Sequence, residues 1–158
     1  MSMADETIRL KPHHFLDLLR DLGAGRSFSS PPGYGHAVPQ VAAALQANPD
    51  VLLELTAGID DICAPCTHNV NGACDDLIGR YDPPVSKDEY NRRLDERWCE
   101  RLGLGEGHRM TARAFCLLAS AKMGDLRTIY LERGEAETQA RQEEVLRGVE
   151  VFLALPRR

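Results

Sequence analysis

The chain has 158 residues and a mass of 17.5 kDa, the size of one domain that buries a hydrophobic core of its own. Its net charge of -5 and its pI near 5.5 disfavour non-specific nucleic-acid binding, because that affinity depends on clustered cations. No apolar window is long enough to span a membrane, and "MSMADETIRLKPHHF" lacks the apolar run of a secretory leader. We therefore expect a cytoplasmic protein.

The N-terminal half predicts two helices and one strand. In "KPHHFLDLLRDLG", Pro12 suits a first helical turn, the leucines form one apolar stripe, and Gly23 ends the helix. The next loop is rich in glycine, serine and proline, and Phe28 stands where a dinucleotide-binding fingerprint needs its third glycine. A second helix is expected over residues 36–47, followed by a strand over residues 51–55.

The C-terminal half predicts three more helices. One begins near Lys87, with Ser86 as its N-cap and Glu89 as the capping-box partner. Another covers residues 111–123, and an amphipathic helix closes the chain over about residues 135–155. We therefore expect a mainly α-helical single domain, residues 1–158, with about five helices and at most one small sheet. A cysteine-rich metal-binding loop should pack against the start of the first helix.

Three of the five cysteines lie in the stretch "CAPCTHNVNGAC". Cys63 and Cys66 form a C-x2-C pair whose thiolates can face one ion, and the loop that follows returns Cys74 toward them. Zinc and iron-sulfur clusters both use thiolates from such turns. Three unrelated loop thiols, or a dithiol redox pair, are the alternatives. Cys99 and Cys116 fall on predicted helices and are expected to be buried thiols.

A closed site needs a fourth ligand, and the first predicted helix offers candidates. His14 and Asp17 are three residues apart, so they share one helix edge with His13. His68 follows Cys66 too closely to close the tetrahedron easily, but it can hydrogen-bond to the site.

Aspartates flank the cysteine stretch on both sides, and we expect them mainly to form turns and caps. Those residues are Asp60, Asp61, Asp75 and Asp76. Asp61, like His13 and His68, is expected to hydrogen-bond to the metal ligands without binding the metal itself.

The stretches "IRLKPHHFLDLL" and "DDICAPCTHNVNGAC" together resemble the family known as domain of unknown function 1284. These are small bacterial and archaeal proteins suspected of binding an iron-sulfur cluster, with no established activity. The resemblance covers roughly residues 8–120. It implies that position 17, a cysteine in the family pattern, contributes a ligand, so that Asp17 here would point at the three thiolates. Lys11 replaces the family's usual arginine.

The aspartate at this position affects the choice of metal. A carboxylate suits zinc as a fourth ligand, whereas iron-sulfur clusters are held mostly by thiolates. The cysteine spacing also matches neither bacterial ferredoxins nor the radical enzymes that cleave S-adenosylmethionine. An iron-sulfur cluster therefore follows from the resemblance, and Zn²⁺ is the alternative.

Three classes of function remain open. The metal could mainly hold the fold together, or an open coordination position could activate water with a histidine as proton carrier. A dithiol redox protein is the third class. The sequence identifies no reaction, substrate, partner or oligomeric state.

Overall fold

The computed structural model describes residues 6–156. The N-terminal residues 1–5, on which the expectation of no leader partly rests, lie outside this range. Within it, the mainly α-helical class with about five helices is confirmed. The helices are α1 (Pro12–Ala24), α2 (Val38–Ala47), α3 (Lys87–Leu102), α4 (Ala112–Ala121) and α5 (Glu135–Leu153), and a 3-10 turn, η2 (Leu126–Thr128), precedes α5. None of these helices combines the length and the apolar character needed to cross a lipid bilayer.

The first strand of a three-stranded sheet leads directly into the first helix. The strand order of this sheet is β1 (Thr7–Leu10), β2 (Leu52–Leu55) and β7 (Arg109–Thr111), with β1 parallel and β7 antiparallel to β2. The expected strand at residues 51–55 is β2. The parallel pairing places the end of β1, and so the start of α1, beside the segment that leaves β2.

The expectation of at most one small sheet is wrong. Two two-stranded ribbons lie between β2 and β7 in the described chain, and each of their strands has two residues. They are β3 (Asn69–Val70) with β4 (Ala73–Cys74), and β5 (Leu77–Ile78) with β6 (Val85–Ser86). Strands this short show no alternation of apolar and polar residues, so turns and tertiary contacts define them.

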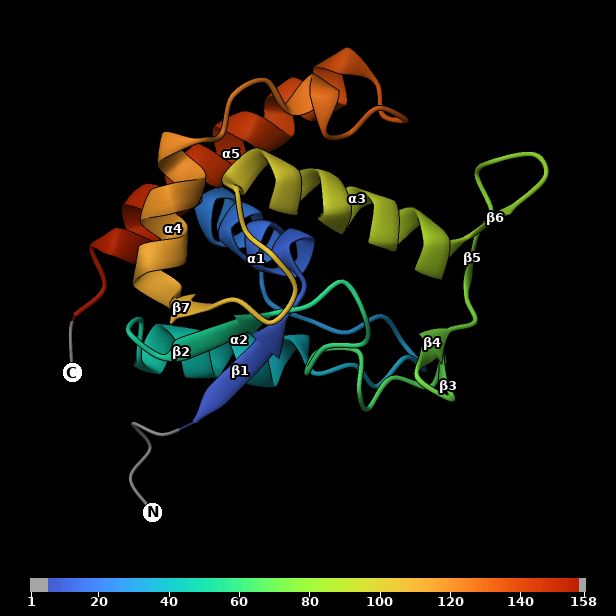
Figure 1. The fold of residues 1–158 in the computed structure, drawn as a ribbon, viewed down its shortest axis with the longest axis horizontal. Helices are drawn as coiled ribbons and strands as arrows, with labels where there is room; N and C mark the ends of the chain where they lie inside the picture. The colour runs from blue at the N-terminus through green and yellow to red at the C-terminus, as the bar shows by residue number, and fades with distance from the viewer. Residues whose placement is uncertain (1–5, 157–158) are drawn as a thin grey trace.

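Helix α1 lies at the centre of the fold in the view of Figure 1, with α3 above it, α4 to the left and the sheet below, while α5 runs from the top of the view down to the left. The ring of Phe15 packs edge-on against Phe115 of α4, at 5.0 Å between centroids, and against Phe152 of α5, at 5.7 Å. The first and last helices therefore share one apolar core.

Two glycines allow α1 and α5 to approach closely. A Cβ atom built at Gly148 would overlap the carbonyl oxygen of Leu19, and one at Gly23 would overlap the carbonyl oxygen of Glu144. Only residues without a side chain fit at this crossing.

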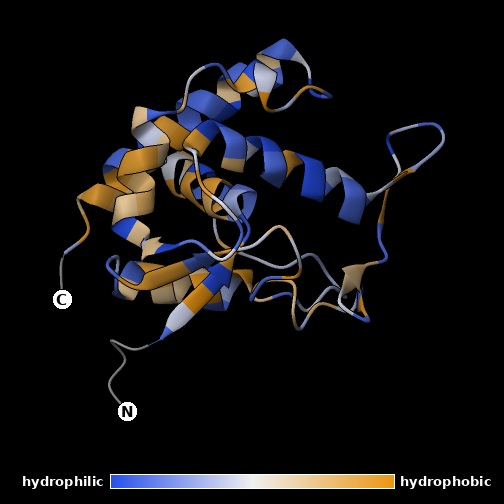
Figure 2. Ribbon diagram, viewed as in Figure 1, coloured by the Kyte–Doolittle hydropathy of each residue, from blue (hydrophilic) through white to orange (hydrophobic). Residues whose placement is uncertain are grey.

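Helix α3 begins as the sequence predicts, because the Ser86 side chain accepts a hydrogen bond from the Glu89 N–H. Its inward side carries four buried residues spaced four apart, of which Trp98 is fully buried: Tyr90, Leu94, Trp98 and Leu102. Figure 2 shows the rest of α3 as mostly hydrophilic, as expected for a helix on the outside of the core. The helix expected at 36–47 begins at Val38, and those expected at 111–123 and 135–155 end at Ala121 and Leu153.

Candidate metal centre

The start of α1 takes its capping carboxylates from distant parts of the chain. Lys11 occupies the N-cap without using its side chain as a cap, and Pro12 follows it. The Lys11 N–H donates to Asp60, and the His13 N–H donates to Asp95 of α3 at 2.8 Å. These contacts satisfy N–H groups at the helix start and fix α1 against the segment that follows β2.

Asp60 is the residue around which the site is built. Its buried carboxylate accepts hydrogen bonds from the Lys11 N–H at 2.9 Å and the Cys63 N–H at 3.0 Å, and it lies 2.6 Å from His14 Nδ1. Burial alone would raise the pKa of Asp60, but His14 and the two backbone N–H groups outweigh it and lower that pKa. Asp60 is therefore a fixed anion at the centre of the site.

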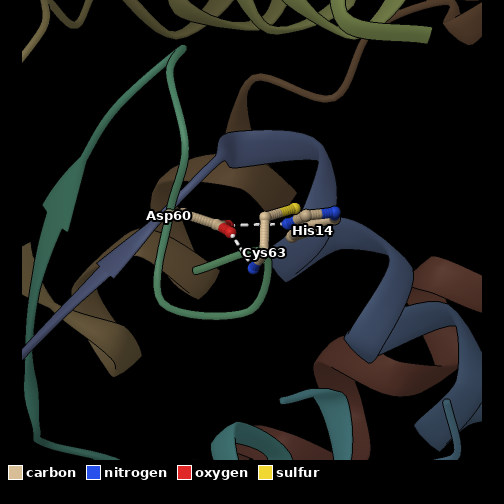
Figure 3. Close-up of side chains that lie close together, drawn as sticks. All are labelled: His14, Asp60 and Cys63. Atoms are coloured by element: carbon tan, nitrogen blue, oxygen red, sulfur yellow. Dashed lines mark hydrogen bonds and ion pairs between the residues drawn. The ribbon is translucent and has the colours of Figure 1, made fainter. Parts of the chain in front are cut away.

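His14, Asp60 and Cys63 form a candidate metal-binding group. Each offers one ligand atom, and these atoms lie within 4.8 Å of one another. Figure 3 shows His14 on the first turns of α1, with Asp60 and Cys63 on the loop that passes beside it. His14 thus meets two loop residues that lie 46 or more positions further along the chain.

The Asp60 contact determines which nitrogen of His14 can bind a metal. With Nδ1 donating to the carboxylate, the lone pair of the ring lies on Nε2. Burial, together with the neighbouring His13, lowers the pKa of His14. A neutral, oriented imidazole is the form in which histidine ligates metals.

Cys63 lies beside a buried cation. The Nζ atom of Lys11 is 3.8 Å from the Cys63 sulfur, and Lys11 is only 2% exposed. Lys11 has no carboxylate ion-pair partner within residues 6–156. Burial and the nearby Asp60 raise the pKa of the Cys63 thiol to about 12. Without a metal this thiol is protonated, unlike redox-active cysteines, whose pKa values are lowered.

Cys66 and Cys74 are placed by two turns, and neither belongs to the group of three. The Cys66 N–H donates to the Cys63 carbonyl at 2.9 Å, and Cys74 pairs with Asn69 across the β3–β4 ribbon. Asn71 and Gly72 both have positive φ, as a two-residue type I′ hairpin turn requires. This hairpin returns Cys74 toward the start of the loop.

Asp17 faces a different part of the molecule. Its carboxylate accepts a hydrogen bond from Arg141 of α5 at 2.6 Å, and it is not part of the group around His14. The ring of His13 lies 4.4 Å from that of His14, but its Nδ1 lies 2.9 Å from the Asp95 carboxylate of α3. Burial alone would lower the pKa of His13, but the contact with Asp95 raises it.

The remaining supporting residues lie at the edges of the loop. His68 contacts Asp75 at 2.7 Å, and its ring lies 4.6 Å from the Tyr34 ring. Asp61 accepts a hydrogen bond from the Arg9 N–H, and its own N–H donates to the Arg9 carbonyl, both at 2.9 Å. Asp61 therefore clamps β1 to the loop.

Tyr34 and His36 lie near the site although no sequence pattern singled them out, and Asp60, expected to be a turn residue, lies at its centre. Tyr34 donates to Asp76 at 2.7 Å, and its backbone carbonyl accepts from the Thr67 N–H at 2.8 Å. The buried Nδ1 of His36 has no partner within the described chain. A histidine in the glycine-rich "PPGYGH" loop was the available signal for this residue.

Cys116 is fully buried in the core, as expected, and Cys99 is partly buried. Burial raises the pKa of Cys116 to about 12 and that of Cys99 to about 11.

Comparison with protein families matches residues 32–130 to a family profile described as "Protein of unknown function (DUF1284)". That description names no metal and no activity, and the match begins after α1, so it includes Asp60 and the cysteine loop but not His14. No curated protein matches the chain. No solved structure matches it either. Because the profile covers more than half of the chain, the protein belongs to the DUF1284 family.

Proposed function

We propose that this protein binds a metal through His14 Nε2 and the thiolates of Cys63, Cys66 and Cys74, and that the metal joins the start of α1 to the cysteine loop. The observation that supports this most strongly is the contact between His14 Nδ1 and the buried Asp60 carboxylate. A carboxylate behind an imidazole is the usual support of a metal-ligating histidine.

The proposal replaces Asp17 with His14 as the fourth ligand. Asp17 is held by Arg141, whereas the ring of His14 lies next to Cys63. Cys66 and Cys74 are outside the group of three, so we propose that their side chains rotate toward the ion as the loop closes on it. His36, whose buried Nδ1 has no hydrogen-bond partner in the described chain, is the alternative nitrogen ligand in place of His14.

Zinc fits this mixed nitrogen and sulfur set best. An iron-sulfur cluster, which the family resemblance implied, would use the same three thiols. The buried ammonium of Lys11 beside Cys63 favours an anionic centre of that kind. Both cofactors need free thiols, which fits a reducing compartment such as the cytoplasm.

The test is metal and sulfide analysis of the full chain, purified without oxygen, and of four variants. His14→Ala, Cys63→Ser and Cys74→Ser should each reduce bound metal strongly, whereas Cys99→Ser, a thiol on α3 outside the loop, should retain it. Zinc without sulfide in a colourless protein supports the zinc site, and iron with equal sulfide in a brown protein supports a cluster. Metal content that is unchanged in His14→Ala and Cys63→Ser would reject the site.

A further inference from the structure

An open pocket of about 430 Å³ lies beside the cysteine loop. Its walls come from the β5–β6 ribbon, the first turns of α3, the segment before α5 and the loop that carries Tyr34. In Figure 1 the ribbon projects beyond the start of α3 on the right. Segments far apart in sequence thus enclose one space.

The pocket is cationic although the protein as a whole is acidic. Arg80, Lys87 and Arg133 line it together with a single carboxylate, Asp76. The chain has a formal net charge of -5. A concentration of positive charge in a hollow of a negative protein attracts anions to that point.

Two of the cations are held in place by aromatic rings. Lys87 Nζ lies 5.4 Å from the ring centroid of Tyr34, and the Arg133 guanidinium lies 6.0 Å from that of Tyr90. Arg133 Nε also donates to the Tyr90 hydroxyl at 3.3 Å. Positioned cations lose less side-chain entropy when a ligand binds.

Arg80 has the most available charge in the pocket. Its guanidinium lies over the Tyr81 ring and donates to the Tyr81 hydroxyl, and it makes no ion pair with any carboxylate in the described residues. By contrast, Asp76 already pairs with Lys87 at 3.4 Å, and Arg133 with Glu137 at 3.0 Å. A bound anion would therefore neutralise the positive charge of Arg80.

We propose that this pocket binds a small oxyanion, the phosphate or carboxylate group of a low-molecular-mass ligand, through Arg80, Lys87 and Arg133. Guanidinium groups match the paired oxygens of either group. Tyr34 connects the pocket to the cysteine loop, because it lines the pocket and its ring lies 4.6 Å from the ring of His68. The oxyanion proposal does not depend on metal binding, so it can be tested on metal-free and metal-loaded protein alike.

The experiment is an NMR titration of the full-length, isotope-labelled chain with inorganic phosphate and, separately, with citrate, at an ionic strength held constant with chloride. Saturable shifts are expected at the amides of Gly79, Asn91 and Arg133, with a millimolar or tighter dissociation constant for at least one probe. The probe that binds more tightly identifies the oxyanion.

Arg80→Gln and Arg133→Gln should each weaken binding about tenfold, or about 1.4 kcal/mol. Arg92→Gln is the matched control, because Arg92 lies on α3 close to the pocket but does not line it, and it pairs with Asp88. The spectra of the variants report directly whether they remain folded. The proposal is overturned if neither probe gives saturable shifts, if the shifts lie away from the pocket, or if Arg80→Gln binds as tightly as Arg92→Gln.

Discussion

The carboxylate of Asp17 on α1 accepts a hydrogen bond from the guanidinium of Arg141 on α5 at 2.6 Å, joining residues 124 positions apart. Arg141 is buried, and its guanidinium carbon lies 4.5 Å from the centroid of the Tyr130 ring, a cation–π contact that holds the side chain in place. The pair ties the first helix to the last. In this structure the Asp17 carboxylate therefore has a cationic partner within the fold.

Asp17→Asn should therefore reduce the free energy of unfolding by about 1–2 kcal/mol, because Arg141 keeps its buried charge and loses its counter-ion. Bound metal should not change. Asp21→Asn, which disturbs the exposed pair with Arg26, should cost less than about 1 kcal/mol. Urea unfolding with metal analysis measures both quantities, and loss of metal in Asp17→Asn would return Asp17 to the ligand set.

Asp60→Asn should weaken metal affinity about 10–100-fold. The amide can still meet His14, but it lacks the charge that orients the ring and that favours a bound cation. Asp61→Asn is the neighbouring control, since Asp61 contacts Arg9 of β1 and not His14. Competition with a chromophoric chelator measures both affinities, and equal losses in the two variants would contradict the role given to Asp60.

Removal of the metal should loosen the two segments that it joins. Hydrogen exchange is expected to rise in residues 9–14 and 60–76 and to change little in α4, and the melting temperature should fall. The comparison is the full chain before and after chelation. Identical exchange in both N-terminal segments would show that the metal does not connect them.

The two thiols on helices, Cys99 and Cys116, should be alkylated slowly in metal-free native protein. The pKa values of Cys116, about 12, and Cys99, about 11, are raised by burial, so at pH 8 almost none of either thiol is ionised. Their alkylation should be slow at pH 8 and should accelerate as the pH approaches those values. Mass spectrometry after iodoacetamide treatment assigns each rate, and rapid modification of Cys116 at pH 8 would be inconsistent with the fold.

Gly148→Ala and Gly23→Ala should destabilise the fold by about 1–3 kcal/mol or more, because each added methyl group meets the backbone of the opposite helix. Gly105→Ala is the control, since a methyl group there meets no atom within 4 Å. Thermal or urea unfolding measures the difference. Equal stability of Gly148→Ala and Gly105→Ala would mean that α1 and α5 can separate at little cost.

The helices could be predicted because their signals are local. Ser86 and Glu89 mark the start of α3, and the apolar stripe through Trp98 marks its buried side. Strands β1 and β7 gave no such signal, since each exists only through hydrogen bonds to β2. Their pairing is a long-range property that a short segment does not encode by itself.

The loop and the helix that form the site could also be predicted, but the residue that joins them could not. His14 and Asp17 stand on one helix edge by sequence spacing, and only the packing of α5 decides that Asp17 meets Arg141. Asp60 resembles any aspartate before a turn until β1 and β2 pair, which places its carboxylate under Lys11 and His14.

The packing of α1 against α5 has a consequence for biosynthesis. Helix α1 leaves the ribosome well before α5, yet these two make the most extensive helix contact in the described chain. While residues 135–153 are still being made, the apolar stripe of α1 lacks its main partner. The core around α1 therefore closes only once residues 135–153 are available.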